Sequence, residues 1–456
     1  MKEIWVLIDC NNFFVSCERV FRPDLQKQPV LVLSSNDGCT VSRSSEVKRI
    51  GVQMGAPKFQ IEDLIKKHQI HCFSSNFGLY ADMSTRVMRT IREVSGVENQ
   101  EVYSIDECFV RGHSLGVKNW LSWGKSLKKK IEKEVGIPVT VGIAGTKTLA
   151  KLAVEVAKKD LLGEGVAFWN PEQKDWEETC VNQIKVNEVW GIGGATARKL
   201  FRQKINTVGE FKQKQRQWVR DEFGLGGEKT WRELKGESCI EHLESQVNHK
   251  TILRSRSFGE GVKEKAELQR AVAEYMTIAG ENLRRHQLRA GLVTVFVRTG
   301  YYNEKEQKYG SSKTISLDQS TSYLPDLMMA AMQVLDQIFV KGFVYKKAGV
   351  ILSGLESENA WQPALPMREQ QLKPSGMANS AGEEGQDLSL TEEKKQIMMR
   401  TIDRLNRKYG QRKINVGMIC DSNNDLGQAV VAKWRSKATL RSAEYTTKWE
   451  ELKVVN

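Results

Sequence analysis

The alternation of apolar and polar positions predicts a mixed α+β protein whose first elements are strands. Residues 4–8 form an apolar run that is long enough for one buried strand and too short for a helix. Residues 102–110 form a second strand-forming run, interrupted by the adjacent carboxylates Asp106 and Glu107. Since neighbouring strand residues face opposite sides, both acids can face water only at a turn or an edge. We therefore expect a hairpin tip at Asp106 and Glu107.

Asp9 directly follows the first strand, so this strand and the hairpin can bring three carboxylates to one rim of a sheet. Carboxylates beside apolar strands are costly without compensation, which a divalent cation commonly supplies. Three of them can hold two Mg²⁺ ions about 3.5–4 Å apart, an arrangement that stabilises the attacking and leaving oxygens of phosphoryl transfer. A solvated Asp-Glu turn is the alternative interpretation, and the spacing alone does not decide between the two.

Two stretches of the chain show the same order of predicted elements. In the first, helices over residues 80–98 and 116–134 and a strand over 137–144 combine with the first strand and the hairpin into a β-α-β-β-α-β unit. A basic amphipathic helix follows at 147–158. The second stretch has strand 251–259, helix 263–286, strands 291–299 and 312–321, helix 324–339 and strand 345–354. The pattern therefore predicts an α+β multidomain chain.

Composition narrows the class of protein. With 456 residues the chain can form two or more domains with full cores. Its formal net charge of +13 suits a polyanionic partner, although basic proteins also bind membranes or acidic proteins. The eight cysteines include no Cys-x-x-Cys pair, which argues against a zinc site and a disulfide framework. No signal-peptide pattern and no apolar run of membrane-spanning length is present, so we expect a cytoplasmic protein without a membrane partner.

A series of motifs runs in order along nearly the whole chain. They are Asp9 followed by Asn11-Asn12-Phe13-Phe14, Leu79-Tyr-Ala-Asp-Met-Ser84, Tyr103-Ser-Ile-Asp-Glu107, Thr140-Val-Gly-Ile-Ala144 with Lys147-Thr-Leu-Ala-Lys151, Val189-Trp-Gly-Ile-Gly193, Arg256-Ser-Phe-Gly-Glu260 and Tyr445-Thr-Thr-Lys448. Together they resemble the Y-family translesion DNA polymerases. The closest resemblance is to the UmuC-like branch, which contains the catalytic subunit of bacterial DNA polymerase V.

The resemblance implies a template-directed, error-prone DNA polymerase of the bacterial DNA-damage (SOS) response. Such an enzyme binds primer-template DNA and deoxynucleoside triphosphates. The resemblance also implies that Asp9, Asp106 and Glu107 are catalytic and bind two Mg²⁺ ions. The backbone carbonyl of Cys10 is expected to complete one metal site.

The same resemblance assigns a nucleotide pocket to the N-terminal part of the chain. Its expected residues are Phe13, Phe14, Val41, Ser42, Lys48 and Lys158. Phe14 is expected to lie beneath the sugar and to exclude a 2′-hydroxyl by its volume, unless it is only a core residue. Lys48 would supply a point charge to the triphosphate, with a solvated helix face as the alternative. The small residues Gly38 and Cys39 would leave space above the template base.

Two further regions are expected to hold DNA. Gly191 and Gly193 are typical of a helix-hairpin-helix turn, in which the N-terminal amides of the next helix bind a phosphate. A plain glycine turn is the alternative. In the second β-α-β-β-α-β unit, basic strand residues could line a groove that follows the DNA backbone, although charged outer faces are ordinary in half-exposed sheets. These residues are Arg254, Arg256, Arg298 and Lys313.

Residues 357–393 are typical of a flexible linker because Pro, Gly and Ser are frequent there. Part of it resembles the short peptide with which bacterial polymerases dock on the sliding clamp. The candidate anchors are Gln386, Leu388 and Leu390. A helix over 391–408 is the competing interpretation, since Thr391 and the following glutamates suit a helix start. The resemblance also implies a UmuD-like accessory subunit and RecA as partners.

The resemblance divides the chain into polymerase domains. These are a palm (1–12 and 86–169), fingers (13–85), a helical thumb (170–236), a linker (237–249), a little finger (250–356), the flexible linker (357–393) and a C-terminal UmuC-like tail (394–456). Two other classes of protein remain: a non-catalytic DNA-binding protein with this fold, and a two-metal nuclease or cyclase on a related palm. The intact carboxylates argue against the first class. Phe14 and the long DNA-holding C-terminal half argue against the second.

Overall fold

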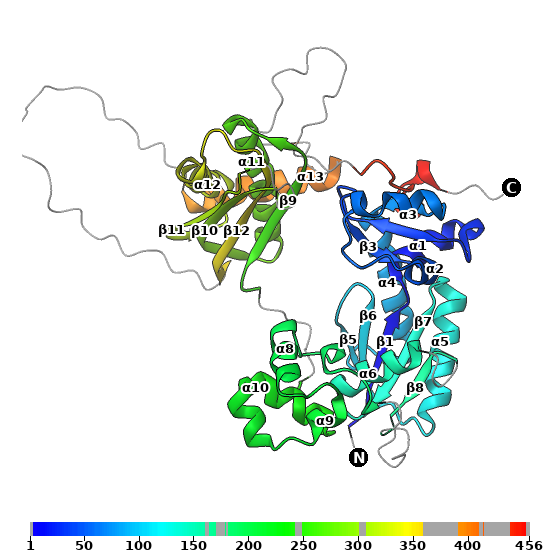
Figure 1. Ribbon diagram of the computed structural model, residues 1–456. Coiled ribbons are helices and arrows are strands. Elements are labelled where there is room, and N and C mark those ends of the chain that lie inside the picture. Colours follow the sequence, from blue (N-terminus) through cyan, green and yellow to red (C-terminus); the bar gives the residue numbers. More distant parts are fainter. Residues whose placement is uncertain are drawn as a thin grey trace, which may run out of the picture. The chain divides into compact units, whose positions relative to one another are not determined.

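The computed structural model describes residues 3–159, 164–169, 178, 181–241, 249–300, 307–358, 391–409, 414 and 438–452 (Figure 1). The chain divides into two compact units. Unit 1 comprises residues 1–247 and 438–456, and unit 2 comprises residues 248–437. We describe each unit by itself. None of the described helices is long and apolar enough to cross a membrane.

Unit 1 combines short strands with helices and contains the first predicted β-α-β-β-α-β series. Its strands are β1 (Trp5–Cys10), β2 (Val30–Leu33), β3 (Thr40–Arg43), β4 (His71–Ser74), β5 (Gln100–Val102), β6 (Glu107–Arg111), β7 (Val139–Ala144) and β8 (Val166–Phe168). Its helices are α1 (Phe13–Phe21), α2 (Ser45–Ile50), α3 (Glu62–Lys67), α4 (Phe77–Ser95), α5 (Trp120–Val135), α6 (Lys147–Lys158), α8 (Gly194–Arg202), α9 (Val208–Lys212) and α10 (Arg216–Leu234). Short 3₁₀ turns are η1 (Pro23–Leu25), η2 (Lys58–Gln60), η4 (Val186–Glu188) and η7 (Trp449–Glu451).

Within residues 3–169, a five-stranded sheet has the order β5-β6-β1-β7-β8. The central strand β1 divides its side chains between two cores, as the period of two in a strand requires. Val6 and Ile8 belong to the core that contains α4 and α5, whereas Trp5 and Leu7 belong to the core that contains α6. Both faces of β1 are therefore covered. Asp9 follows these residues at the end of the strand, where its side chain is only 14% exposed.

Helix α6 packs tightly against this sheet and connects it to the helices that follow. A side chain at Gly142 of β7 would place its Cβ 2.2 Å from the backbone oxygen of Ala150, so only glycine permits this approach. At the start of α6, the backbone amide of Thr148 donates to Oε2 of Glu233 in α10 over 3.1 Å. The apolar residues of α6 share one core with α8 to α10. Contacts with β7 on one side and with α10 on the other therefore fix the position of α6.

A smaller sheet in unit 1 has the order β3-β2-β4. Its central strand β2 pairs antiparallel with β3 and parallel with β4. Leu31 and Leu33 face a small core with Val47 of α2, while Val30 and Val32 face the large core that α1 and α4 share. This sheet therefore lies against the same core as β1, next to the end of the strand that carries Asp9.

Unit 2 is the second β-α-β-β-α-β unit, and the predicted order of elements is confirmed. Its elements are β9 (Ile252–Val262), α11 (Lys265–Arg285), β10 (Leu288–Thr299), β11 (Gly310–Thr321), α12 (Leu324–Ile338), β12 (Tyr345–Ser357) and α13 (Glu392–Tyr409). The described strands form one sheet in the order β11-β10-β12-β9. Val295 of β10 and Val350 of β12 are fully buried in a core with α11 and α12, so these helices cover one face of the sheet.

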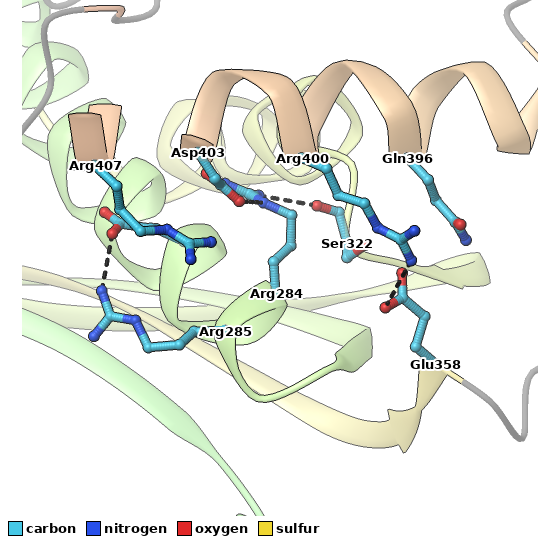
Figure 2. Close-up of a pocket in the computed structure, with 9 residues that line it drawn as sticks. Arg284, Arg285, Ser322, Glu358, Gln396, Arg400, Asp403 and Arg407 are labelled. Carbon is cyan, nitrogen blue, oxygen red and sulfur yellow. Dashed lines mark hydrogen bonds and ion pairs between the residues drawn. The ribbon is translucent and has the colours of Figure 1, made fainter. Parts of the chain in front are cut away.

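Helix α13 lies far along the chain from the sheet but is part of unit 2 (Figure 2). Met399 of α13 is buried in the core of the unit. Asp403 of α13 accepts two hydrogen bonds from Arg284 of α11, over 2.7 and 2.8 Å, and both side chains are at most 10% exposed. The backbone oxygen of Ser322 takes a third hydrogen bond from Arg284 over 3.1 Å. The first part of the predicted C-terminal tail is therefore held by a buried ion pair.

We predict that Asp403→Ala destabilises unit 2 by about 3 kcal/mol, because it leaves the buried Arg284 guanidinium without its carboxylate. Denaturant unfolding of the full chain measures this loss. Arg400→Ala on the same helix is the matched control, since Arg400 is 68% exposed and 3.7 Å from Glu358. The control is expected to cost less than about 1 kcal/mol. Equal effects of the two variants would contradict a structural role for the buried pair.

Candidate active site

The end of β1 and the tip of the β5-β6 hairpin bring three carboxylate residues together. Asp9 lies directly opposite Glu107 in the antiparallel pairing of β1 with β6. The backbone amide of Cys10 donates to the backbone oxygen of Asp106 over 2.9 Å, which ties the hairpin tip to β1. The pairing register therefore places Asp9, Asp106 and Glu107 at one rim of the sheet, as the sequence predicts.

Ser104 holds the hairpin tip in shape. Its hydroxyl accepts from the backbone amides of Asp106 and Glu107 over 3.2 and 3.0 Å. It also donates to Oδ1 of Asp106 over 2.5 Å. Such local bonds from a serine to nearby amides stabilise turns. The orientation of the Asp106 carboxylate is thus set within the turn itself.

Burial and like charge make the end of β1 an unfavourable place for a carboxylate. Burial raises the pKa of Asp9 to about 6, and the negative charges of Glu107 and Asp106 act in the same direction. The ammonium group of Lys158, 2.9 Å from Oδ1 of Asp9, opposes the shift. Burial would lower the pKa of Lys158, but Asp9 and Glu155 outweigh it and raise this pKa. A positive charge is therefore favoured beside Asp9.

Lys151 is a residue of the site that the sequence analysis did not assign. Its Nζ donates to both carboxylate oxygens of Glu107, over 2.9 and 3.1 Å. The same ammonium lies over the rings of Tyr103 and Trp190, 4.7 and 5.3 Å from their centroids. Lys151 and Lys158 are seven residues apart on α6, and this spacing places them on one helix face. That spacing was the signal available in the sequence.

The donor set at this rim suits divalent cations. In the present arrangement, Lys158 pairs with Asp9, Lys151 pairs with Glu107, and Ser104 bonds to Asp106. Among the residues that the structure describes, no three His, Cys, Asp or Glu side chains lie close enough to share one metal ion. Hard carboxylate oxygens at adjacent positions are nevertheless the ligands that Mg²⁺ prefers. The ammonium groups of Lys151 and Lys158 occupy positions beside the carboxylates at which a positive charge is favourable.

Phe14 belongs to an aromatic cluster at the start of α1. Its ring stacks on Tyr80, with centroids 4.5 Å apart, and meets the edge of Phe77 at 6.0 Å. Phe14 is half-buried, whereas Phe13 is only 3% exposed and belongs to the core of unit 1. The side chain of Phe13 is therefore a core residue in this structure. Phe14 keeps part of its ring accessible.

The other expected nucleotide residues lie on β3 and α2. Val41 is half-buried, and Ser42 is 6% exposed. Lys48 is an exposed residue of α2. Partial desolvation and the positive charges of Arg43 and Lys158 lower its pKa, against the opposing effect of Asp9. The charges of Asp9 and Lys158 therefore both act on Lys48.

The glycines of the expected helix-hairpin-helix occupy the turn before α8. Gly191 has φ +95°, and a Cβ there would lie 2.5 Å from the hydroxyl of Thr230. Gly193 is the residue at the N-terminus of α8, and a Cβ there would meet open space. The element before the turn is the short 3₁₀ turn η4 in place of a full helix. Among the described residues, the full helix α8 therefore follows the glycine turn, and a 3₁₀ turn precedes it.

Comparison with known proteins identifies the family. Residues 8–155 match the model of the impB/mucB/samB family, and residues 249–365 match the model of the impB/mucB/samB family C-terminal domain. The chain is 35% identical over 452 residues to the protein ImpB of Salmonella typhimurium, covering 98% of this chain and 99% of ImpB. It is 35% identical over 453 residues to UmuC of Salmonella typhimurium strain LT2, with the same two coverages. The chain belongs to the impB/mucB/samB family.

Membership in this family makes the chain a Y-family DNA polymerase of the UmuC group. A solved structure of a Y-family DNA polymerase chimera of Dbh and Dpo4 has the same fold, with a TM-score of 0.64 at 19% sequence identity. The similarity covers 78% of this chain and 99% of the chimera. Residues 396–455 match a domain of unknown function (DUF4113). The family resemblance predicted from the motifs is confirmed.

The basic residues expected to line one DNA groove in this UmuC-like chain do not share a face of the unit 2 sheet. Arg254 and Arg256 of β9 lie opposite the buried residues Val350 and Ala348 of β12. Directly opposed side chains point to the same face. Arg254 and Arg256 are therefore on the face that the helices cover, where the edge strand β9 leaves them partly accessible.

The other two basic residues are on different faces from each other. Lys313 of β11 lies opposite the buried Val295 and contacts Gln337 of α12 over 3.5 Å, so it is also on the helix side. Arg298 lies opposite Gly310 and is on the open face. The four basic residues therefore do not line one face of the sheet, and their role in DNA binding stays a prediction. Alternation along a strand was visible in the sequence, but which residues faced the helices was not.

The expected clamp peptide with Gln386, Leu388 and Leu390 lies outside the described residues. The competing helix is present as α13, one residue after Thr391. The hydroxyl of Thr391 accepts from the backbone amide of Lys394 over 3.5 Å, as a residue at a helix start does. The prediction of a helix start at Thr391 is thus confirmed.

We predict that the affinity of the protein for Mn²⁺ falls about tenfold for each pH unit below the raised pKa of Asp9. Burial places this pKa at about 6, so Asp9 is increasingly protonated as the pH falls through that value and can no longer bind a cation. Calorimetric titration of the full chain with Mn²⁺ at several pH values measures this dependence. Asp9→Asn is the control. It should bind Mn²⁺ weakly, and its affinity should depend less on pH. The same steep dependence in both proteins would exclude Asp9 as a ligand.

Proposed function

We propose that this Y-family polymerase copies DNA past damaged bases, using two divalent cations, as part of the bacterial DNA-damage (SOS) response. The observation that carries the proposal is the register that pairs Asp9 with Glu107 and ties Asp106 to Cys10. This register concentrates carboxylates at one rim of a sheet. Lys158 places a positive charge 2.9 Å from Asp9 at this rim, and the charge of Asp9 also acts on Lys48.

The three carboxylates would hold two Mg²⁺ ions, with the backbone carbonyl of Cys10 as a further ligand. When bound, such ions stabilise the attacking 3′-oxygen of a primer and the leaving pyrophosphate. The chain's own residues then position the substrate. Lys158, which pairs with Asp9 in this structure, would offer its ammonium group to a phosphate of the incoming nucleotide if Asp9 held a cation. Lys48 offers a second charge to the same triphosphate.

Phe14 would select the sugar of the incoming nucleotide. Its ring is fixed against Tyr80 and Phe77 and has no donor or acceptor for a 2′-hydroxyl. A ribonucleotide would therefore lose the hydration of that hydroxyl and meet the ring. Gly38 and Cys39 precede β3, where their small size would leave room for an altered template base.

The domain assignment follows from the same proposal. The five-stranded sheet with α4 to α6 would be the palm, the β3-β2-β4 sheet with α1 to α3 the fingers, and α8 to α10 the thumb. Unit 2 would be the little finger. The ligands would be primer-template DNA and deoxynucleoside triphosphates, and the helix α8 behind Gly193 suits a DNA phosphate.

We predict that Asp106→Ala abolishes nucleotide addition and leaves DNA binding intact, because the positive charges that attract DNA lie elsewhere. Primer extension on undamaged and abasic templates measures the first property, and fluorescence anisotropy with labelled primer-template measures the second. Asp82→Ala is the control, since Asp82 forms an exposed pair with Arg86 on α4. Extension by Asp106→Ala at near the wild-type rate would refute the assignment of the metal site. An inactive wild-type protein that binds DNA would favour the non-catalytic class.

We predict that Phe14→Ala raises the incorporation of ribonucleotides relative to deoxynucleotides by at least about tenfold, a change of roughly 1.4 kcal/mol in transition-state free energy. The truncated side chain leaves room for the 2′-hydroxyl. Single-nucleotide insertion with dGTP and GTP measures the ratio. Tyr409→Ala is a control for loss of an aromatic residue elsewhere, since Tyr409 lies on α13 of unit 2 and is 60% exposed. If the ratio stays constant in Phe14→Ala, Phe14 is a core residue and the sugar is selected elsewhere.

A further inference from the structure

The described C-terminal residues 438–452, which we call the C-terminal strap, contact the β3-β2-β4 sheet of unit 1 (Figure 1, red). At the end of the edge strand β4, the backbone amide of Ser74 donates to the backbone oxygen of Leu440 over 3.0 Å. In return, the amide of Leu440 donates to the hydroxyl of Ser74 over 2.9 Å. Ser74 also forms an isolated parallel bridge with Arg441. The strap thus extends the edge of the sheet by one short pairing.

A second contact lies at the start of α4. Asn76, which caps this helix, is fully buried, and its Nδ2 is 3.1 Å from three acceptors of the strap. These acceptors are the backbone oxygens of Ser442 and Ala443 and the hydroxyl of Ser442. The ring of Tyr445 stacks on Phe21 of α1, with centroids 4.7 Å apart. The strap therefore connects the helices α1 and α4.

A third contact lies in the turn before β3. Oδ2 of Asp37 accepts from the backbone amide and the hydroxyl of Thr439, over 2.9 and 3.1 Å. Asp37 is only 8% exposed, and it directly precedes Gly38 and Cys39. The strap thus holds the turn that we assign to the template-base side of the nucleotide pocket.

The central contact leads from the strap to Phe14. The hydroxyl of Ser442 donates to Oε1 of Glu18 over 3.0 Å, and the hydroxyl of Tyr80 donates to the same oxygen over 2.6 Å. Glu18 and Tyr80 are both fully buried. The ring of Tyr80 in turn stacks on Phe14. Ser442 and Phe14 are therefore connected through two buried side chains.

The hydrogen bonds of the buried Glu18 carboxyl group restrict the positions of Tyr80 and Ser442. Burial raises the pKa of Glu18, while the hydrogen bonds from Tyr80 and Ser442 and the charge of Arg22 oppose the shift. A buried carboxyl group needs its donors, because each unmade hydrogen bond inside a protein is costly. Among the described residues, Oε2 of Glu18 is buried without a hydrogen-bond partner, so Oε1 takes the side-chain hydrogen bonds of this carboxyl group, from Tyr80 and Ser442. The position of the Tyr80 ring is thus tied to the presence of the Ser442 hydroxyl.

We propose that the C-terminal strap is a positioning element of the nucleotide pocket, in which Ser442 fixes the sugar-selecting Phe14 through Glu18 and Tyr80. This inference rests on the proposed function and deepens it, because it assigns a role in substrate selection to part of the domain of unknown function. It makes Ser442 a positioning residue, not a catalytic one, since its contacts are with Glu18 and Asn76.

The test compares single-site variants of the full chain in steady-state insertion of dGTP and GTP. Ser442→Ala is expected to lower the discrimination against GTP by about threefold to tenfold, the range that the net contribution of one ordinary hydrogen bond supplies. The loss should come mainly from a lower KM for GTP, with kcat for dGTP nearly unchanged. Ser442→Thr retains the hydroxyl and should restore the discrimination. Trp449→Ala is the matched control, because Trp449 is in the strap and 86% exposed.

Tyr80→Phe is a second test, which keeps the ring on Phe14 and removes the donor to Glu18. This variant should also lower the discrimination against GTP. If Ser442→Ala does not fold, Tyr80→Phe alone tests the proposal. Unchanged discrimination in both variants, with a lower melting temperature, would show that the strap only stabilises the fold and would overturn the proposal. A wild-type protein that inserts neither nucleotide would instead refute the proposed function, on which the role of Ser442 rests.

Discussion

The pairing of Asp9 with Glu107 across β1 and β6 is the constraint on which the site depends. It places carboxylates side by side at the covered end of a sheet, where burial raises the pKa of Asp9 to about 6. Such an arrangement is stable only with positive charge beside it. Lys151 and Lys158 supply that charge in the present structure. A divalent cation would supply it during the proposed reaction.

The position of α6 follows from the same requirement. Its two lysines reach the carboxylates only if the helix lies close to β7, and Gly142 permits that approach. The opposite side of α6 packs with α8 to α10, and its first turn bonds to Glu233. The helix that neutralises the carboxylates therefore also holds the candidate thumb. A change in the packing of α6 would therefore affect both Asp9 and the turn of Gly193 before α8.

The C-terminal part of the chain supports both units. Helix α13 is held to unit 2 by the buried pair of Arg284 and Asp403, while the C-terminal strap is held to unit 1 by Asp37, Asn76 and Glu18. The sequence predicts a single C-terminal tail over residues 394–456. Its described parts instead belong to separate units, and each is bound mainly through polar and charged groups. Through Ser442, the C-terminal strap would contribute to the selection of the nucleotide.

Local patterns in the sequence determined the order of strands and helices, the hairpin tip at Asp106 and the helix that begins after Thr391. Apolar periodicity, turn residues and helix caps act over a few residues, so they can be identified without the fold. The tertiary structure alone decided which partners met. Lys151 reaches Glu107, Ser442 reaches Glu18, and Arg254 and Lys313 lie on the helix side of their sheet, because strand register and helix packing join residues that are distant along the chain. For the same reason, the four basic residues expected to line a groove in unit 2 do not share one face of the sheet.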